Sequence, residues 1–434
     1  MRCRVPRDAG ILAGEEDQAG CLRSSMLLTD KRHWPVHVVR LICAGPFVLA
    51  SSGHALADEG DTINFAVGAD VRYEDNLFRF EDGVDTDSLP GRPHKSDTIY
   101  ALNAGIKIDK PYAQQRFKLD VMATQNKFQR NSFLDYTGVD YTAAWFWHLT
   151  PRVSGIVLLD QQQSLVDFGD YRTFDERNIQ TSQFRLFSID GDLGAGWHAI
   201  GGVSEVRARN SQTFDEVGDY EQVGIELGGK YVSRADNWVS LVRRESRGKY
   251  QGRELDPLEQ LDEGFDQSET EAKLYWKLTG KSTVDAKLGY LDRTHDNFSQ
   301  RDYDGAVGKL AYQWDATGKL QVNASLGRNL FSFQGTTNSY YVADTLSISP
   351  VWKVTAKSKL WLRYDLSERD YRGPIVTSAK TRDDLMQSLV FAGEWRPTRT
   401  VTVGAALQRD LRSSNIDRFD YDADSANVYA QLLF

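Results

Sequence analysis

Two short stretches of the 434-residue sequence carry side chains of the kinds that act in catalysis or metal binding. His295 stands beside Asp296, and a carboxylate next to a histidine is the pairing that orients a general base. Asp420, Asp422 and Asp424 alternate along one face of an extended chain, which resembles a calcium-binding arrangement. The glycine and closing glutamate of an EF-hand loop are missing, so we expect a solvated acidic loop and no metal site.

Recognisable catalytic signatures are absent from the sequence. It contains neither the G-x-S-x-G nucleophile turn nor the H-E-x-x-H zinc motif. The histidine at 295 has no second acidic partner in its neighbourhood, and surface histidines beside aspartates are common. The sequence therefore predicts a protein that is not an enzyme, with no catalytic residues and no cofactor.

A larger set of charged residues alternates with apolar residues in many segments. Such alternation predicts that the charged side chains line a polar interior, where they would bind hydroxyls and carboxylates weakly, as passage of a solute requires. The alternative is that they form ion pairs which brace a barrel wall. The candidates are Asp70, Arg72, Lys107, Arg116, Lys118, Asp120, Glu205, Arg207, Arg209, Glu226, Arg243, Lys273, Lys287, Arg363 and Asp365.

The elements that position these residues have a two-residue period. In residues 62–73 the apolar side chains occupy every second position, and the positions between them are mostly small or polar. This pattern is typical of a strand with one apolar and one polar face. It recurs along the chain, no stretch has a comparable helical period, and no apolar run approaches the length of a membrane-spanning helix.

Short polar turns alternate with longer acidic loops between these strands. We expect short turns at 109–111, 150–152, near Gly194, and at 233–237, 279–282, 315–319, 355–358 and 396–400. Short turns at one end and long loops at the other are typical of outer-membrane barrels. The sequence predicts an all-β fold, a transmembrane antiparallel up-and-down β-barrel of about 18 strands with both termini periplasmic; 16 strands is the alternative count.

The tryptophans support the same architecture. Every tryptophan after residue 57 lies near a predicted short turn, which favours an aromatic girdle at the periplasmic membrane interface. These residues are Trp145, Trp147, Trp197, Trp238, Trp276, Trp314, Trp352, Trp361 and Trp395.

Residues 1–57 have the composition of a leader. Basic residues precede the apolar stretch 41–50, and Ala55-Leu56-Ala57 forms a cleavage site, so we expect a Sec signal peptide over 26–57 and a miscalled start over 1–25. Cys43 raises a lipoprotein alternative, but Ile42 precedes it where a small residue is needed. Removing the leader's seven basic and five acidic residues leaves 45 basic and 56 acidic residues in the rest of the chain. This acidic balance excludes a nucleic-acid partner.

The sequence from 58 to 434 is then a single outer-membrane barrel domain. It finishes on an alternating strand, SANVYAQLLF, whose terminal aromatic resembles the signal read by the outer-membrane insertion machinery. We therefore expect Phe434 to act as an assembly signal, and the last strand to pair with the strand that begins near Thr62, because an open edge would leave backbone groups unsatisfied in lipid.

Four stretches resemble one family of outer-membrane proteins. ADVRYEDNLFRF (69–80), IDKPYAQQRFKLD (108–120), YTAAWFWHLTPRVSG (141–155) and RSSNIDRFDYD (412–422) are similar to EpsL-type exopolysaccharide biosynthesis proteins, a putative-porin group associated with exosortase systems. The resemblance implies an integral protein of the Gram-negative outer membrane that conducts a nascent exopolysaccharide through a hydrated, charge-lined lumen. It further implies outer-membrane lipid, the exopolysaccharide chain and periplasmic or inner-membrane export components as partners. The alternative is a general or substrate-selective porin for small solutes.

Overall fold

The computed structural model describes residues 62–89, 91–171, 175–212, 219–335, 338–374 and 380–434. The predicted leader, with its signal peptide and Cys43, lies outside these residues. The strands are β1 (Ile63–Glu74), β2 (Asp97–Tyr112), β3 (Gln115–Phe128), β4 (Tyr136–Thr150), β5 (Val153–Leu165), β6 (Ile179–Gly194), β7 (Trp197–Asn210), β8 (Asp219–Val232), β9 (Trp238–Gln251), β10 (Gly264–Thr279), β11 (Ser282–Thr294), β12 (Tyr303–Trp314), β13 (Leu320–Ser332), β14 (Tyr340–Lys353), β15 (Ser358–Arg372), β16 (Asp383–Trp395), β17 (Val401–Ser414) and β18 (Tyr421–Leu433).

Helical structure in the described residues is confined to four single 3-10 turns in the loops. They are η1 (Thr86–Ser88), η2 (Ser132–Leu134), η3 (Ser299–Arg301) and η4 (Asp417–Phe419). No described helix is both long and apolar enough to cross a membrane.

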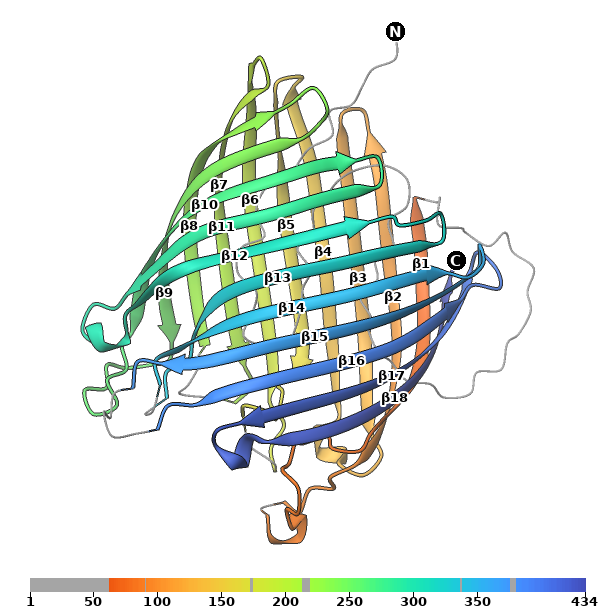
Figure 1. Ribbon diagram of the computed structural model, residues 1–434, viewed down its shortest axis with the longest axis vertical. Helices are drawn as coiled ribbons and strands as arrows, with labels where there is room; N and C mark the ends of the chain where they lie inside the picture. Colours follow the sequence, from red (N-terminus) through yellow and green to blue (C-terminus); the bar gives the residue numbers. More distant parts are fainter. Residues whose placement is uncertain (1–61, 90, 172–174, 213–218, 336–337, 375–379) are drawn as a thin grey trace.

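The strands form one closed antiparallel sheet. Each strand pairs with its neighbours in sequence, and β1 pairs with both β2 and β18, so the 18-stranded ring has no free edge. This confirms the predicted up-and-down barrel and excludes the 16-stranded alternative. In Figure 1 the strands β10–β18 form the near wall and β1–β9 the far wall of the barrel.

The turns follow the predicted alternation. Seven of the eight predicted short turns fall between consecutive strands as expected, for example between Val232 and Trp238 and between Thr279 and Ser282. The first one was placed too early, because Pro111 pairs with Arg116 within the ladder and the chain reverses at Ala113, which has a positive φ of 53°. A proline can occupy such a position when its missing N–H removes no ladder hydrogen bond.

The seam between the first and last strands extends to the last residue. The backbone N–H of Phe65 donates to the carbonyl of Phe434 at 2.6 Å, and the Phe434 N–H donates back at 2.9 Å. The two rings lie 6.1 Å apart. Nine residue pairs from Ala66↔Leu433 to Glu74↔Ser425 continue the ladder, so closure depends on the full length of β18.

The inner wall near this seam requires small residues. Gly404 of β17 faces Tyr429 of β18, and a Cβ added to Gly404 would lie 2.4 Å from the tyrosine ring. Ala66, which lies on the same inner face of β1, has no solvent exposure. Large side chains at these positions would push apart the strands that complete the ring.

Deletion of Phe434 should impair assembly, since it removes both backbone hydrogen bonds to Phe65 and one ring contact at the seam. We expect a large loss of the heat-modifiable, folded band on an SDS gel. The matched control is Leu258→Ala in the exposed β9–β10 loop, which should assemble normally. Normal folding of the deletion variant would show that the terminal pair is dispensable. The role of Phe434 as a signal for the insertion machinery stays a prediction.

Candidate functional site

The two faces of the sheet have inverted burial relative to a water-soluble protein. In β1 the apolar Phe65 and Val67 are 47% and 40% exposed, whereas Asp70, on the other face, has no exposure. Residues opposite each other in an antiparallel ladder share a face, so this assignment can be followed around the ring. The exterior is apolar in its short-turn half, and the interior carries the buried polar groups.

Eleven of the fifteen predicted lumen residues point to the interior. Their strand partners are other inward-facing residues, for example Lys107 opposite Asp120 and Glu226 opposite Arg244. The inward set is Asp70, Arg72, Lys107, Arg116, Lys118, Asp120, Glu226, Lys273, Lys287, Arg363 and Asp365. A role for these residues in transport stays a prediction.

Four predicted lumen residues face outward instead. Glu205 lies opposite Val223, which is 45% exposed, and Arg207 and Arg209 share its face of β7. Arg243 lies opposite Leu227, which is 69% exposed. The buried residues that face the interior on these two strands include Ile200, Val206 and Ala208 on β7 and Arg244 on β9.

The wrong placement of these four residues has a physical cause. In β9 both alternating sets contain apolar and charged residues. In β7 the charged residues share one set with Trp197 and Val203, and the other set also contains apolar residues, so the period gives the strand without giving its inner face. The ladder with adjacent strands decides the face. The sequence reasoning therefore missed Arg244, whose guanidinium bonds Glu226 at 3.1 Å and Glu269 at 2.9 Å.

The tryptophan girdle is also only partly as predicted. Seven of the nine tryptophans lie on the outward face: Trp145, Trp147, Trp197, Trp276, Trp314, Trp352 and Trp395. Trp238 pairs with inward-facing Tyr275 and stacks on its ring, and Trp361 lies inside under the ammonium group of Lys359. Proximity to a turn does not specify the face, which again follows from the ladder.

The histidine and aspartates that the sequence raised as candidates for catalysis or metal binding have other partners in the structure. His295 is buried and its Nδ1 lies 3.2 Å from Asp302, whereas Asp296 is exposed and pairs with Arg247 at 3.6 Å. The His295–Asp296 pair that the sequence raised and set aside is not formed. Asp422 and Asp424 both accept hydrogen bonds from Arg409 on the outside of the barrel. Within the described residues no group of acidic, histidine or cysteine side chains is arranged to hold a metal ion.

Inward-facing charges on β8–β11 are extensively ion-paired. Glu269 joins Arg244 to Lys287, at 2.9 Å and 3.2 Å, and Lys273 pairs with Glu271 at 2.6 Å. Burying such groups is tolerable because each charge has an opposite partner. On these strands the ion-pair bracing expected as the alternative is present.

The loop between β5 and β6 crosses the outer mouth of the barrel; we call its described residues, 166–171 and 175–178, the strap. Asp170 of the strap accepts hydrogen bonds from Arg369 at 2.9 Å, Arg382 at 2.7 Å and Arg412 at 2.6 Å. Arg412 lies on β17, which is separated from β5 by β4, β3, β2, β1 and β18 in the closed sheet. The strap is therefore held by the wall across the lumen.

The three arginines form a buried cluster at this wall. Asp384 on β16 bonds Arg382 at 2.8 Å and Arg412 at 2.5 Å, so two carboxylates face three guanidinium groups. The guanidinium of Arg382 also lies 3.6 Å from the centre of the Phe419 ring. Charge-assisted hydrogen bonds in a site shielded from water are among the stronger polar contacts in proteins, so this latch is well secured.

An aromatic contact fixes the first part of the strap. The ring of Phe168 lies 4.6 Å from that of Phe78 in the β1–β2 loop. Phe78 and Phe80 are buried against inward-facing Ile99 and the neighbouring Leu134. The β1–β2 loop thus folds into the mouth and supports the strap from below.

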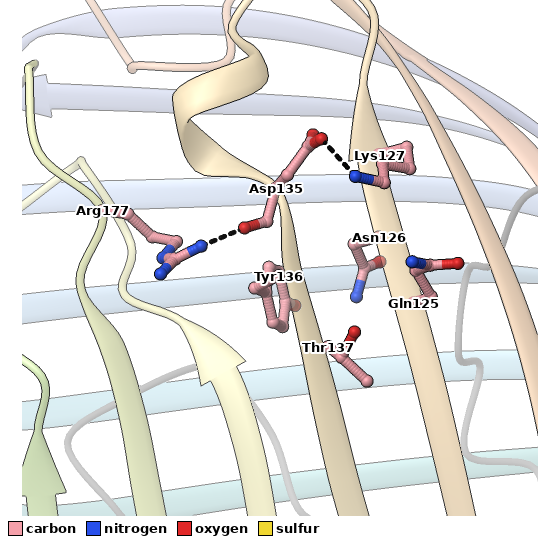
Figure 2. A pocket seen from close by; sticks show the side chains of 7 residues that line it. All are labelled: Gln125, Asn126, Lys127, Asp135, Tyr136, Thr137 and Arg177. Carbon is pink, nitrogen blue, oxygen red and sulfur yellow. Dashed lines mark hydrogen bonds and ion pairs between the residues drawn. The ribbon is translucent and has the colours of Figure 1, made fainter.

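The base of the strap is tied to the β3–β4 loop. Figure 2 shows Arg177 of the strap donating to the carbonyl oxygen of Asp135, whose carboxylate accepts from Lys127 at 2.7 Å. A polar cavity of about 240 Å³ lies here, lined also by Tyr136 and Thr137. It opens at the rim of the barrel, away from the arginine cluster.

Arg301, in the β11–β12 loop, connects this loop to two of the other long loops. Arg301 is buried, and its guanidinium donates to the carbonyl oxygens of Glu259 and Gln260 in the β9–β10 loop and of Gly335 and Asn338 in the β13–β14 loop. Burial without a carboxylate partner lowers the pKa of Arg301 to about 10. The guanidinium remains charged at neutral pH, and its hydrogen bonds connect the β9–β10 and β13–β14 loops to the β11–β12 loop that carries Arg301. We call this arrangement the Arg301 staple.

Charged side chains of the interior differ in exposure. Lys107 and Asp120, which face inward on β2 and β3 and pair with each other at 2.6 Å, have side chains 38% and 44% exposed. In the arginine cluster at the outer mouth, the side chains of Arg382 and Arg412 are 3% and 1% exposed. The strap and its latch occupy the outer mouth of the barrel, which makes them the candidate site of selectivity.

A closed ring of antiparallel strands with an apolar exterior and a polar interior satisfies its backbone within lipid. The protein is an integral outer-membrane β-barrel. The first residue of β1 and the last residue of β18 lie on the short-turn side, which in such barrels is periplasmic.

Comparisons with solved structures find proteins of similar architecture. The Pseudomonas aeruginosa outer membrane protein OpdK is 12% identical, over 86% of this chain and 99% of that one, with a TM-score of 0.45. OccK2 (OpdF) of the same organism is 11% identical, over 86% and 98%, with a TM-score of 0.48. Values this low support no inference about transported solutes, so the fold and location rest on the closed ladder and its apolar exterior.

No protein-family model and no curated protein matches the chain. The resemblance to EpsL-type proteins therefore receives no support from these comparisons.

Replacing Asp170 with asparagine should loosen the strap, because the neutral amide cannot form charge-assisted bonds with the three arginines. Each such bond contributes roughly 1.5–3 kcal/mol, so we expect strap amides to exchange with solvent at least ~10-fold faster. Hydrogen-exchange mass spectrometry measures this. Glu263→Gln in the β9–β10 loop is the control, and unchanged exchange in Asp170→Asn would show that the latch contributes little.

The stability of the closed strap should also decrease on acidification, because the latch depends on an ionised Asp170. Burial alone would raise the pKa of Asp170, but Arg369 and Arg382 outweigh burial and hold it below its ordinary value. The carboxylate thus stabilises the closed strap above about pH 4, the ordinary pKa, and this stabilisation is lost as pH falls through the lowered pKa. Strap exchange, corrected for its intrinsic pH dependence, should be constant from neutrality to about pH 5. A release between pH 6 and 7 would contradict this assignment.

Proposed function

We propose that the protein is a substrate-selective channel for small hydrophilic solutes, with the strap across its outer mouth as the element that limits what passes. The observation that carries this proposal is the latch between Asp170 and the three arginines of the opposite wall. A barrel whose mouth is spanned by a fixed loop discriminates by size and charge at that point.

The geometry of the interior supports a non-catalytic passage. Charged side chains line both halves of the lumen, and on β2 and β3 Lys107 and Asp120 remain partly exposed while they pair with each other. Accessible groups of both signs offer many weak contacts to a hydrated solute. Weak contacts suit conduction, because tight binding would stop transit.

Export of an exopolysaccharide is the competing proposal, and it rests on the resemblance to EpsL-type proteins. A polymer occupies the passage along its whole length throughout secretion. The strap, the contact of its Phe168 with Phe78, and the hydrogen bonds of Arg301 would all have to be displaced together for that time. These contacts favour the small-solute channel.

The channel can be tested with purified protein in proteoliposomes. We expect swelling in small neutral sugars that stops abruptly as the sugar becomes larger, and a higher size limit in Asp170→Asn, because the strap then leaves the mouth. Glu263→Gln should behave as the unmodified protein. Absence of swelling in the smallest sugars, with protein shown to be folded, would refute the proposal.

A gene deletion separates the two proposals in cells. Reduced uptake of small solutes with normal surface polysaccharide is expected of a channel. Loss of surface polysaccharide with normal uptake would instead establish export. The Asp170→Asn variant, expressed in the deletion strain, should restore whichever of uptake or surface polysaccharide was lost. The heat-modifiable band on the gel shows that the variant is folded.

A further inference from the structure

The outward face of β6–β9 carries a group of basic residues that the channel does not use; we call it the basic sector. It consists of Arg185 on β6, Arg207 and Arg209 on β7, and Arg243, Arg247 and Lys249 on β9. Three of these residues, Arg207, Arg209 and Arg243, were expected in the lumen. Their place on the exterior requires a different explanation.

The basic sector begins where the apolar band ends. On β6 the outward residues from the short turn are Leu193, Ile189 and Phe187, all exposed and apolar, and Arg185 follows on the long-loop side. On β9 Leu241 is 60% exposed and Arg243 follows it. Because short turns are periplasmic, the basic side chains lie at the level of the outer-leaflet headgroups.

The charges of the basic sector are only partly compensated. Glu205 pairs with Arg185 at 3.1 Å, Glu221 with Arg207 at 3.1 Å, and Glu245 with Arg243 at 2.6 Å. Arg247 pairs with Asp266 on β10 at 3.5 Å and with Asp296 at 3.6 Å. Within the described residues, Arg209 and Lys249 form no ion pair. Six basic groups stand against four outward carboxylates on β6–β9 (Glu205, Asp219, Glu221 and Glu245), so the basic groups on these strands outnumber the acidic ones by two.

The outward face of β11–β18 has the opposite character. Its carboxylates on β11–β18 are Asp292, Asp304, Asp344, Glu368, Asp370, Asp383, Asp422 and Asp424. The basic residues among them are Arg328, Arg372 and Arg409, each hydrogen-bonded to one or two of these carboxylates. On β11–β18 the outward carboxylates therefore outnumber the basic residues, whereas on β6–β9 the basic residues outnumber the carboxylates.

We propose that the basic sector binds the phosphorylated headgroup of an outer-leaflet lipid. Guanidinium groups match phosphate oxygens with paired N–H donors, and a group of them beside exposed apolar side chains suits a ligand with phosphates above acyl chains. The apolar residues below, such as Phe187 and Val203, would contact the chains. This lipid site is independent of the channel proposed above.

The proposal predicts a loss of phosphate-dependent lipid binding in the quadruple variant Arg207→Gln, Arg209→Gln, Arg243→Gln and Arg247→Gln. Each basic group near an anionic membrane surface contributes roughly fivefold, so binding should weaken by at least ~100-fold. Native mass spectrometry of the detergent-solubilised barrel, titrated with lipid A carrying its phosphates or enzymatically dephosphorylated, provides the measurement.

A matched control replaces the outward basic residues elsewhere, Lys127, Arg328, Arg372 and Arg409, with glutamine. It removes the same charge and should bind phosphorylated lipid A as the unmodified barrel does. A charge-retaining Arg→Lys version of the quadruple variant should keep most of the binding, which guards against a folding defect, and the heat-modifiable band checks folding in each case.

Three outcomes would overturn the proposal. Equal binding of phosphorylated and dephosphorylated lipid would show that phosphate is not recognised. Equal loss in the two quadruple variants would show that only net charge matters. Formation of barrel dimers that dissociate in the basic-sector variant would identify a second copy of the chain as the occupant of this face.

Discussion

The need to satisfy every backbone N–H and C=O within lipid is the constraint on which the rest of this structure depends. An open sheet would leave two unpaired edges in the hydrocarbon, so the eighteen strands must return to their starting point. The β1–β18 seam, with its reciprocal bonds between Phe65 and Phe434, completes that ring. Closure then fixes an inside and an outside, and every side chain in a strand is assigned to one of them.

The polarity of the barrel follows from that division. Apolar side chains are exposed to lipid, while the interior must pair its charges or leave them in water. On β8–β11 they are paired and buried, as Arg244 is with Glu226 and Glu269. On β2 and β3 Lys107 and Asp120 also pair, at 2.6 Å, but their side chains are partly exposed. The charges of the interior therefore brace the wall throughout these strands and differ in how far a solute could reach them.

Loop contacts turn the wide ring into a restricted passage. The strap reaches Arg369, Arg382 and Arg412 across the mouth, Phe78 supports it, and Arg301 joins three other loops. None of these contacts has a local signature, because their partners are far apart in the sequence. Asp170 stands in an acidic loop that reads as solvated, and the acceptors of Arg301 are backbone carbonyls, which any residue supplies.

The sequence by itself determined the strands, the position of most turns and the membrane location, since a two-residue period and turn composition are local properties of the chain. The closed ladder decided between 18 and 16 strands. Only the tertiary structure decided which face of an ambiguous strand is inside. Arg207 and Arg243 were expected in the lumen and lie outside, and Trp238 and Trp361 were expected outside and lie within. A shift of one residue in the ladder reverses the faces of a strand, so its register with neighbours must be known.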